Sequence, residues 1–323
     1  MLVGENIAGR SPAIKKVYNL ISKVAPTDST VLLTGETGAG KGIFAEAIHA
    51  LSKRADGPFV AINCSAIPET LLESELFGYK KGSYTGAASD RKGLMEEANK
   101  GSIFLDEIGD MSLSLQSKML HVLENGEVRR LGDNESKKID VRIIAATNKD
   151  LWKEIGLGKF REDLFFRINV VRLHVPPLRE RPEDIPVLIR YFMEKYNKEY
   201  NKNVSRVSED VLSVLGHYDY PGNVRELENI VKHSIIFSEN GIITKADLPS
   251  GIPETALLEA PKKEETGERQ ILGDGFQTIA AVEKRLISET LQKTKNNHTM
   301  TAKKLGVSRS TLWRKMKEYG IEN

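Results

Sequence analysis

The sequence contains a single cysteine and no apolar run of the length that a membrane helix needs. Cys64 cannot form a disulfide within the chain, which favours the reducing cytoplasm. Without an apolar run of about 18 residues or the apolar core of a secretory leader, neither a membrane span nor export is expected. The six histidines lack the spacing of metal ligands, so a structural zinc site is not expected either. The absence of repeats and low-complexity tracts leaves an ordinary soluble globular protein.

The nearly balanced charge hides an uneven distribution. The 323 residues carry a formal net charge of +2, and their composition is ordinary for two or three soluble domains. Residues 282–323 contain ten Lys or Arg and four Asp or Glu, a net charge of +6, so the other 281 residues carry −4. A small basic end on a slightly acidic body favours a nucleic-acid-binding segment attached to a different domain.

Residues 29–175 alternate short apolar runs with helical patterns. Most runs are nearly continuous, as expected for strands of a parallel sheet with helices on both faces. The sequence therefore predicts an α/β fold. Strands are expected at residues 31–33, 59–62, 103–105, 141–146 and 170–173.

The pattern becomes helical after Pro176 and Pro177. Pro182 suits the first turn of a helix, and further helices are expected at about 208–216 and after Pro221-Gly222. One apolar stripe consists of Ile185, Leu188, Ile189, Phe192 and Tyr196. The predicted organisation is an α/β domain at 1–175, an all-helical subdomain at 176–252, a linker at 253–275 and a C-terminal helical domain at 276–323.

A glycine-rich segment follows the first expected strand and precedes a helix that begins near Lys41. This is the context of a phosphate-binding P-loop, because glycines let backbone N–H groups turn toward phosphate oxygens and the helix N-terminus adds its dipole. Lys41 would supply a charge for the β- and γ-phosphates. The spacing alone is a weak signal, and a glycine-rich turn before a surface helix is the alternative. The segment consists of Gly35, Glu36, Thr37, Gly38, Ala39, Gly40, Lys41 and Gly42.

Gly42 stands where a P-loop usually has a Ser or Thr hydroxyl for Mg²⁺. The metal would then depend on phosphate, water and carboxylate ligands, which Mg²⁺ tolerates. Asp106 and Glu107 end the strand expected at 103–105. Asp106 would hold Mg²⁺ through water and Glu107 would polarise the attacking water. Acids are also common where strands reach solvent, so the pairing with the P-loop is what favours catalysis. Asn148 either lies between these carboxylates and the γ-phosphate or merely caps its strand.

The basic C-terminal segment has the pattern of a helix-turn-helix. An amphipathic helix is expected at 282–294, followed by a short helix, a turn containing Gly306, and a second helix with Ser308 as N-cap. Arg309 and Ser310 are the better candidates for base edges, and lysines of the segment for phosphates. The residues expected to face DNA are Arg309, Ser310, Thr311, Arg314 and Lys315. The alternative is a solvated charged face.

These motifs together resemble those of an AAA+ ATPase. Two further stretches, Glu-Ser-Glu-Leu-Phe-Gly at 73–78 and Gly-Ser-Tyr-Thr-Gly-Ala at 82–87, resemble the signature of the bacterial enhancer-binding proteins, which activate sigma-54 RNA polymerase. The family pattern of the second stretch is Gly-Ala-Phe-Thr-Gly-Ala, so Ser83 and Tyr84 are departures, while an aromatic residue and Thr85 are kept. The resemblance covers residues 5–323 and includes a Fis-type DNA-binding module.

The resemblance implies that the loop at 82–87 engages sigma-54 and moves with the state of ATP. A small flexible tip that displays an aromatic ring and a hydroxyl suits transient protein contact. An ordinary hairpin turn is the alternative. The loop consists of Gly82, Ser83, Tyr84, Thr85, Gly86 and Ala87.

The resemblance also implies roles for three other residues. Asn63 matches the asparagine that pairs with the catalytic glutamate and would restrain Glu107 until the γ-phosphate arrives. Arg161 and Arg167 match arginines that act on the neighbouring protomer. Six helical residues correspond to about 600°, so the two side chains would point about 120° apart, and either could be the one that reaches the γ-phosphate. Local pairing with Glu162 or Asp163 is the alternative.

At the ends of the ATPase region, two further segments resemble nucleotide-contacting parts of the family. Arg225 matches an arginine of the helical lid that touches phosphate in cis, with Asn223 as cap of its helix. Pairing of Arg225 with Glu226 or Glu228 is the alternative. Ile7, in the segment 7–11, would cover the adenine base.

The sequence therefore predicts a cytoplasmic sigma-54-dependent transcriptional activator with ATP and Mg²⁺ as cofactors. A dimeric C-terminal module would bind upstream enhancer DNA. The ATPase parts would form a ring, expected to be a hexamer, that remodels sigma-54 RNA polymerase holoenzyme for promoter opening. A DNA-remodelling AAA+ motor would not need the loop at 82–87, and a non-enzymatic repressor would not need Asp106 and Glu107. Since no signal-receiving domain precedes Met1, a fragment or a protein regulated by a separate partner is expected.

Overall fold

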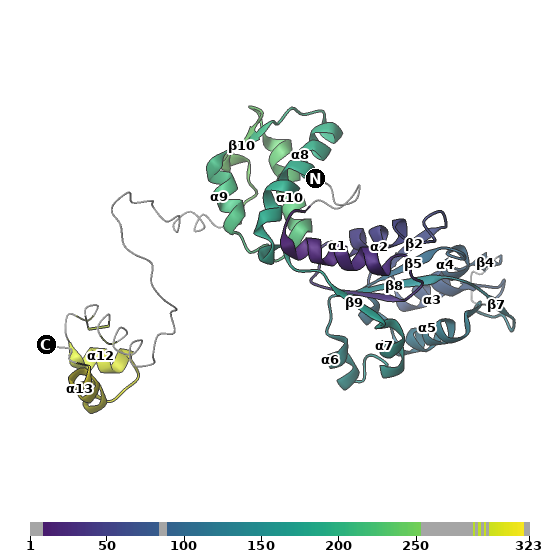
Figure 1. Cartoon of the computed structure of the whole chain (residues 1–323), viewed down its shortest axis with the longest axis horizontal. Coiled ribbons are helices and arrows are strands. Elements are labelled where there is room, and N and C mark those ends of the chain that lie inside the picture. The colour runs from purple at the N-terminus through teal and green to yellow at the C-terminus, as the bar shows by residue number, and fades with distance from the viewer. Residues whose placement is uncertain are drawn as a thin grey trace. The chain divides into compact units, whose positions relative to one another are not determined.

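The computed structural model describes residues 9–83, 89–252, 287, 290, 291, 294 and 297–319, without the side chains of Lys303 and Glu318. The chain divides into two units, Met1–Ala260 and Pro261–Asn323 (Figure 1). Ile7, residues 84–87 of the predicted sigma-54 loop, and the predicted linker at 253–275 lie outside the described residues. Within the described part of the chain, every helix is too short or too polar to traverse a bilayer.

A parallel sheet of five strands forms the centre of the described part of the first unit. In spatial order the strands are β2 (Phe59–Asn63), β5 (Ser102–Asp106), β8 (Arg142–Thr147), β1 (Val31–Thr34) and β9 (Val171–His174). All neighbouring strands pair in parallel. The α/β prediction and its five strands are confirmed, with ends that differ by one residue. Because the strands are parallel, the residues that follow them meet at one edge of the sheet.

Helices cover both faces of this sheet (Figure 1). Successive side chains of β5 point to opposite faces of the sheet, so Ile103 and Leu105 belong to the apolar cluster on one face and Phe104 to the cluster on the other. One face carries α1 (Pro12–Val24) and α2 (Lys41–Ala50), and the other carries α3 (Glu69–Phe77), α4 (Leu94–Glu97), α5 (Leu113–Asn125), α6 (Leu151–Gly156) and α7 (Glu162–Ile168). The sequence analysis did not predict α1, although its buried residues Ile14, Val17, Ile21 and Val24 have helical spacing.

A buried arginine ties α1 to the sheet. Arg142, at the start of β8, is only 2% exposed. Its Nη1 donates to the carbonyl of Ala25 at 2.6 Å and its Nη2 to that of Val24 at 3.0 Å. Burial lowers the pKa of Arg142. Since these carbonyls end α1, the guanidinium satisfies helix-terminal acceptors at the negative end of the helix dipole.

Replacing Arg142 by leucine is expected to lower the free energy of unfolding by about 2–4 kcal/mol. Two buried carbonyls would lose their donors, and each unsatisfied buried polar group costs about 1–3 kcal/mol. Urea denaturation of the full chain measures the effect. Arg190→Leu is the matched control, because Arg190 is exposed and forms no ion pair with the described residues. Equal losses in both variants would contradict the assigned role of Arg142.

Two hairpins extend from the α/β unit. The sequence analysis left a hairpin turn at 82–87 open as an alternative and did not predict the second hairpin. β3 (Gly78–Tyr79) pairs with β4 (Arg91–Lys92), and β6 (Glu127–Arg129) pairs with β7 (Ser136–Lys138), both antiparallel. The backbone of Leu131 joins them, since its N–H donates to the carbonyl of Gly78 and its carbonyl accepts from the N–H of Lys80, each at 3.0 Å. The segment at 82–87 therefore begins from a base that is held by a second hairpin.

The residues after the sheet form a smaller subdomain with its own apolar core. It contains the 3-10 helices η2 (Leu178–Glu180), η3 (Pro182–Asp184) and η4 (Lys245–Asp247), and the helices α8 (Ile185–Tyr200), α9 (Glu209–His217) and α10 (Asn223–Phe237). The predicted stripe of α8 is buried. Pro182 begins η3 rather than α8 itself. The description as all-helical was incomplete, because β10 (Arg206–Val207) and β11 (Ile242–Ile243) form a short parallel pair.

The second unit contains the predicted helix-turn-helix. Its helices are α12 (His298–Lys304) and α13 (Arg309–Glu318). Ser308 caps α13 as predicted, since its Oγ accepts from the N–H of Thr311 at 3.1 Å. Gly306 in the turn has a φ of +67°, a conformation that favours glycine. The core of this unit contains Ile287, Leu291, Ala302, Leu312 and Met316.

Candidate active site

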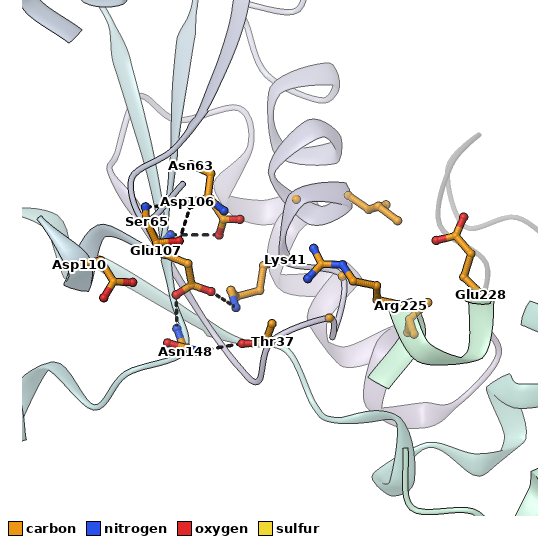
Figure 2. Close-up of a pocket in the computed structure, with 15 residues that line it drawn as sticks. Thr37, Lys41, Asn63, Ser65, Asp106, Glu107, Asp110, Asn148, Arg225 and Glu228 are labelled. Atoms are coloured by element: carbon orange, nitrogen blue, oxygen red, sulfur yellow. Dashed lines mark hydrogen bonds and ion pairs between the residues drawn. The ribbon is translucent and has the colours of Figure 1, made fainter. Parts of the chain in front are cut away.

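Polar residues from distant segments meet at the carboxyl edge of the sheet. They line a cavity of about 440 Å³, a size within the usual range for small-molecule sites (Figure 2). Parallel pairing is the reason, because it brings the ends of β1, β2, β5 and β8 to one edge. The lining residues include Thr37, Gly38, Gly40, Lys41, Gly42, Asn63, Ser65, Asp106, Glu107, Asp110, Asn148 and Arg225.

Lys41 lies between the glycine-rich loop and a catalytic carboxylate candidate. It is the first residue of α2, and Gly40 before it has a left-handed φ of +104°. The Lys41 side chain is almost fully buried. Its Nζ donates to the carbonyls of Gly35 at 3.0 Å and Glu36 at 3.3 Å. It also forms an ion pair with Oε1 of Glu107 at 3.1 Å (Figure 2). The Lys41 ammonium group is thus held between the backbone of the glycine-rich loop and the Glu107 carboxylate.

Glu107 is oriented by a cation and by a backbone amide. It follows β5 with a φ of +53°, a sparsely populated conformation for a residue other than glycine. Its Oε2 accepts from the N–H of Asn148 at 2.9 Å, and Nδ2 of Asn148 donates to Oγ1 of Thr37 at 2.8 Å (Figure 2). Asn148 therefore links the carboxylate to the glycine-rich loop, which is more than the capping of a strand.

Asp106 supplies a second, half-buried carboxylate at the end of β5. Its Oδ1 accepts from the N–H of Glu107 at 3.1 Å. Burial, and then the charge of Glu107, raise the pKa of Asp106, while Lys41 and Arg225 act in the opposite direction. Negative charge thus accumulates beside a pocket that also contains two cations.

Asn63 lines the same cavity without a hydrogen bond to Glu107. Its Oδ1 accepts from the N–H of Ser65 at 2.9 Å and from its Oγ at 2.7 Å. The contacts of Glu107 are with Lys41 and Asn148 instead. The restraint of Glu107 by Asn63 remains a prediction. Ser65 and Asp110 were missed by the sequence analysis, although Ser65 lies two residues after Asn63 at the same strand end.

Arg225 extends into the cavity from the helical subdomain (Figure 2). It lies in the first turn of α10 and pairs with neither expected acid. Glu226 accepts from the N–H of Gly222 at 2.7 Å, and Glu228 accepts from Nζ of Lys195 at 2.8 Å. The prediction that Asn223 caps α10 was wrong, because Gly222 is the N-cap and the side chain of Asn223 contacts the glycine-rich loop.

Arg161 and Arg167 are not among the described residues that line the cavity. The helical angle between them does not apply, because Arg161 precedes α7 in an extended conformation with φ −80° and ψ 133°. Arg161 pairs with Asp163 at 2.7 Å and donates to Oγ of Ser117 at 3.1 Å. Arg167, in the last turn of α7, is exposed and forms no ion pair or hydrogen bond with the described residues. Among the described residues, Arg161 thus has ion-pair and hydrogen-bond partners for its side chain, and Arg167 has none.

Two residues of the predicted sigma-54 loop are described. Gly82 has a φ of +82°, and the Oγ of Ser83 is buried without a hydrogen-bond partner. A Cβ at Gly132 would lie 2.7 Å from the Cβ of Ser83, so the second hairpin packs closely against the beginning of the loop.

The five residues predicted to face DNA all lie on α13. Arg309, Ser310 and Arg314 are exposed, and Thr311 and Lys315 are partly exposed. Leu312 and Met316 of the same helix are buried in the core of the second unit. The helix is therefore amphipathic, with its basic side directed away from the core.

Comparisons with known protein families match three segments of the chain. Residues 7–174 match the sigma-54 interaction domain, residues 179–265 the AAA+ ATPase lid domain, and residues 278–319 the Fis family of bacterial regulatory proteins. The regulatory protein AtoC of Escherichia coli (strain K12) is 43% identical over 98% of this chain and 68% of its own length.

The chain belongs to the sigma-54-dependent transcriptional activators.

Other similar proteins agree with this assignment. The nitrogen fixation protein AnfA of Azotobacter vinelandii is 43% identical to the activator over 98% of the activator and 58% of AnfA. Crystal structures of NtrX from Brucella abortus in complex with ATP and with ADP are 35% and 34% identical, each with a TM-score of 0.71. They are matched over 98% of the activator and over 70% and 69% of NtrX. The activator is thus an ATP-binding AAA+ ATPase with a lid, which is the subdomain of α8–α10, and a DNA-binding helix-turn-helix.

Proposed function

We propose that ATP is hydrolysed in the cavity at the carboxyl edge of the sheet, with Glu107 as the group that polarises water. The observation that carries this assignment is the position of the Glu107 carboxylate, which is held by Lys41 at 3.1 Å and by the N–H of Asn148 at 2.9 Å. The P-loop, residues 35–42, would hold the phosphates through backbone N–H groups and Lys41. Ile7 would cover the adenine base.

The contacts of Lys41 indicate how ATP binding prepares the site. Phosphate oxygens compete with Glu107 for the Lys41 ammonium, because both are anions within reach of one cation. Once Lys41 turns to the phosphates, the Glu107 carboxylate keeps its contact with Asn148 and becomes a better acceptor for a water proton. Asn63 would restrain Glu107 until the γ-phosphate arrives, and Arg225 would contact phosphate from the lid.

The donor chemistry of the cavity fits Mg²⁺. Carboxylate and hydroxyl oxygens of Asp106 and Ser65 line it, and these are hard ligands of the kind that Mg²⁺ prefers. Burial, and then the charge of Glu107, raise the pKa of Asp106, and a bound cation would offset both effects by favouring the charged carboxylate. Asp106 would hold the ion through water, since Gly42 offers no hydroxyl. When bound, Mg²⁺ would neutralise charge on the β- and γ-phosphate oxygens.

A ring of protomers is the arrangement in which Arg161 and Arg167 can act. Arg167 is exposed and unpaired with the described residues, and it is not among those that line its own cavity. It would reach the γ-phosphate held by a neighbouring protomer, while Arg161, paired with Asp163, would organise the contact. We expect a hexamer in the cytoplasm.

The segment at 82–87 would transmit the work of hydrolysis to sigma-54 RNA polymerase holoenzyme. α13 would hold the activator on upstream enhancer DNA as a dimer, with Arg309 and Ser310 nearest the base edges because they begin the helix. Thr311, Arg314 and Lys315 would contact the major groove or its phosphates. The basic tail then keeps the ATPase ring close to the promoter.

Replacing Thr85 by alanine is expected to lower sigma-54-dependent open-complex formation at least tenfold and to leave ATP hydrolysis within about twofold. A single interface residue that matters typically contributes about 2 kcal/mol or more. Heparin-resistant open complexes and phosphate release are measured on the same samples. Ser89→Ala, a hydroxyl deletion just beyond the loop, should change neither. Normal promoter opening by the Thr85 variant would refute the role of the loop.

A further inference from the structure

The lid holds the P-loop through three consecutive backbone carbonyls. The carbonyl of Thr37 accepts from Nδ2 of Asn223 at 3.1 Å, and that of Gly38 accepts from the N–H of Val224 at 3.0 Å. The carbonyl of Ala39 accepts from Nη2 of Arg181 at 2.7 Å. A loop that presents its N–H groups to phosphate must satisfy its carbonyls elsewhere, and here the lid supplies those donors.

A charged pair reinforces this contact at the beginning of the loop. The Glu36 carboxylate forms a two-point contact with the guanidinium of Arg179, at 2.5 and 2.8 Å, and its Oε2 also accepts from Nδ2 of Asn223 at 3.0 Å. The hydrogen bond from Arg179, and then that from Asn223, lower the pKa of Glu36 to about 2. Glu36 is therefore ionised at neutral pH, in the form that pairs with Arg179.

Asn223 is the centre of the contact. It is completely buried, and its φ of +53° is one that asparagine tolerates better than most residues. Its amide uses both ends, because Nδ2 donates to Glu36 and Thr37 while Oδ1 accepts from the N–H of Leu178 at 2.8 Å. The residue thus joins α10, η2 and the P-loop in one set of hydrogen bonds.

The two backbones also touch directly. A Cβ at Gly38, whose φ is +76°, would lie 2.2 Å from the carbonyl oxygen of Gly222. The N–H of Arg225 points to the carbonyl of Gly38 at 3.4 Å. Because the two backbones are in direct contact, a displacement of the lid would also displace the P-loop and the Arg225 backbone.

We propose that Glu36, Arg179 and Asn223 form a latch that fixes the lid on the P-loop and so controls how long nucleotide stays bound. The latch consists of positioning residues. It holds the P-loop carbonyls outward, so that the loop does not have to be ordered when phosphate binds, which reduces the entropic cost of binding. It also fixes the start of α10 that carries Arg225. The inference rests on the proposed binding of phosphate in this cavity.

Opening the latch is expected to speed nucleotide release. In the full chain, Asn223→Asp keeps the acceptor for Leu178 but replaces the Nδ2 donor with a second negative charge beside Glu36. The dissociation rate of a fluorescent ADP analogue, measured by stopped flow, should rise about tenfold, and KM for ATP should rise with it. At saturating ATP, kcat should stay within about twofold, because bound nucleotide returns the lid to the P-loop.

Two surface variants keep the test decisive if Asn223→Asp does not fold. Glu36→Gln and Arg179→Ala should each raise the dissociation rate about threefold, and the double variant should be no faster than the single ones, since they break the same pair. Arg91→Ala is the matched control, because Arg91 forms a similar two-point pair with Glu75, at 2.7 and 2.9 Å, and is not among the described residues of the cavity. Its dissociation rate should be that of the wild type.

The outcomes separate the latch from the proposed site. Dissociation rates equal to the wild type in folded variants, or purely additive effects in the double variant, would overturn the latch. If Lys41→Ala binds the ADP analogue as tightly as the wild-type chain does, the proposed phosphate site itself is contradicted. A faster release with an unchanged thermal midpoint supports the latch, since a merely structural role would lower that midpoint.

Discussion

Arg167→Ala is expected to lower the ATP hydrolysis rate of the activator about 10³-fold, the lower end of the range for arginines that stabilise phosphoryl transfer from a neighbouring subunit. Arg167 is exposed in the last turn of α7, and it forms no ion pair with the described residues. Its charge is thus available to another protomer. The Arg161 side chain pairs with Asp163 and donates to Ser117. Arg161→Ala should therefore lower the hydrolysis rate less than Arg167→Ala does, and should weaken assembly of the protomers more.

Mixing two inactive variants tests whether the arginine acts in trans. A protomer with Arg167→Ala keeps its own Lys41 and Glu107, and a protomer with Glu107→Gln keeps its Arg167. In a proposed mixed ring, some interfaces would combine the intact Lys41 and Glu107 of one protomer with the intact Arg167 of the other, so phosphate release should reappear on mixing. Hydrolysis per protomer of the wild type should also rise with protein concentration. A mixture as inactive as its components, together with a flat dilution series, would contradict the trans mechanism.

Glu107→Gln is expected to lower kcat about 10²–10⁴-fold, the usual contribution of a group that accepts or orients a proton in the transition state. Nucleotide binding should become about three- to tenfold tighter. The reason is electrostatic, because the Glu107 carboxylate neutralises Lys41 at 3.1 Å and its negative charge opposes the phosphates that would bind there. An amide keeps the shape and the contact with Asn148 without that charge.

Phosphate release and equilibrium binding of a fluorescent ATP analogue measure the two effects in one preparation. Asp110→Asn is the matched control. Asp110 lines the same cavity, but its carboxylate pairs with Lys149 at 2.6 Å and makes no contact with Lys41. Its kcat should stay within about threefold of the wild type. Weaker ATP binding by Glu107→Gln would show that the Lys41–Glu107 pair does not compete with phosphate.

The strands, and the site residues that directly follow them, could be predicted because the sequence patterns that mark them are local. Continuous apolar runs mark strands that are buried on both faces, and parallel strands bring their following residues to one edge. Lys41, Asp106, Glu107 and Asn148 could therefore be placed together before their contacts were known. The helix α1 was missed although its apolar residues have helical spacing, and Arg142 gave no signal of its burial.

The contacts that distinguish between residues with the same predicted role could not be predicted from the sequence. Nothing in the spacing of Arg161 and Arg167 indicates that one is engaged by Asp163 and Ser117 and the other is exposed. The same holds for Asn223, which has the sequence context of a helix cap but binds the P-loop. Pairing of Arg161 with Asp163 was a local alternative, but Ser117 and the glycine-rich loop are distant partners whose positions depend on how the helices pack.

The sequence by itself determined the α/β class and the family of this activator, and it indicated the glycine-rich segment and the carboxylates, since periodicity and short motifs depend on neighbouring residues. Only the tertiary structure decided what holds the site in place. Glu36 and Arg179 are 143 positions apart, and Glu36 and Asn223 are 187 apart. Such pairs form because the lid packs on the P-loop, and the free energy that selects them comes from the folded arrangement of whole elements rather than from any local stretch of chain.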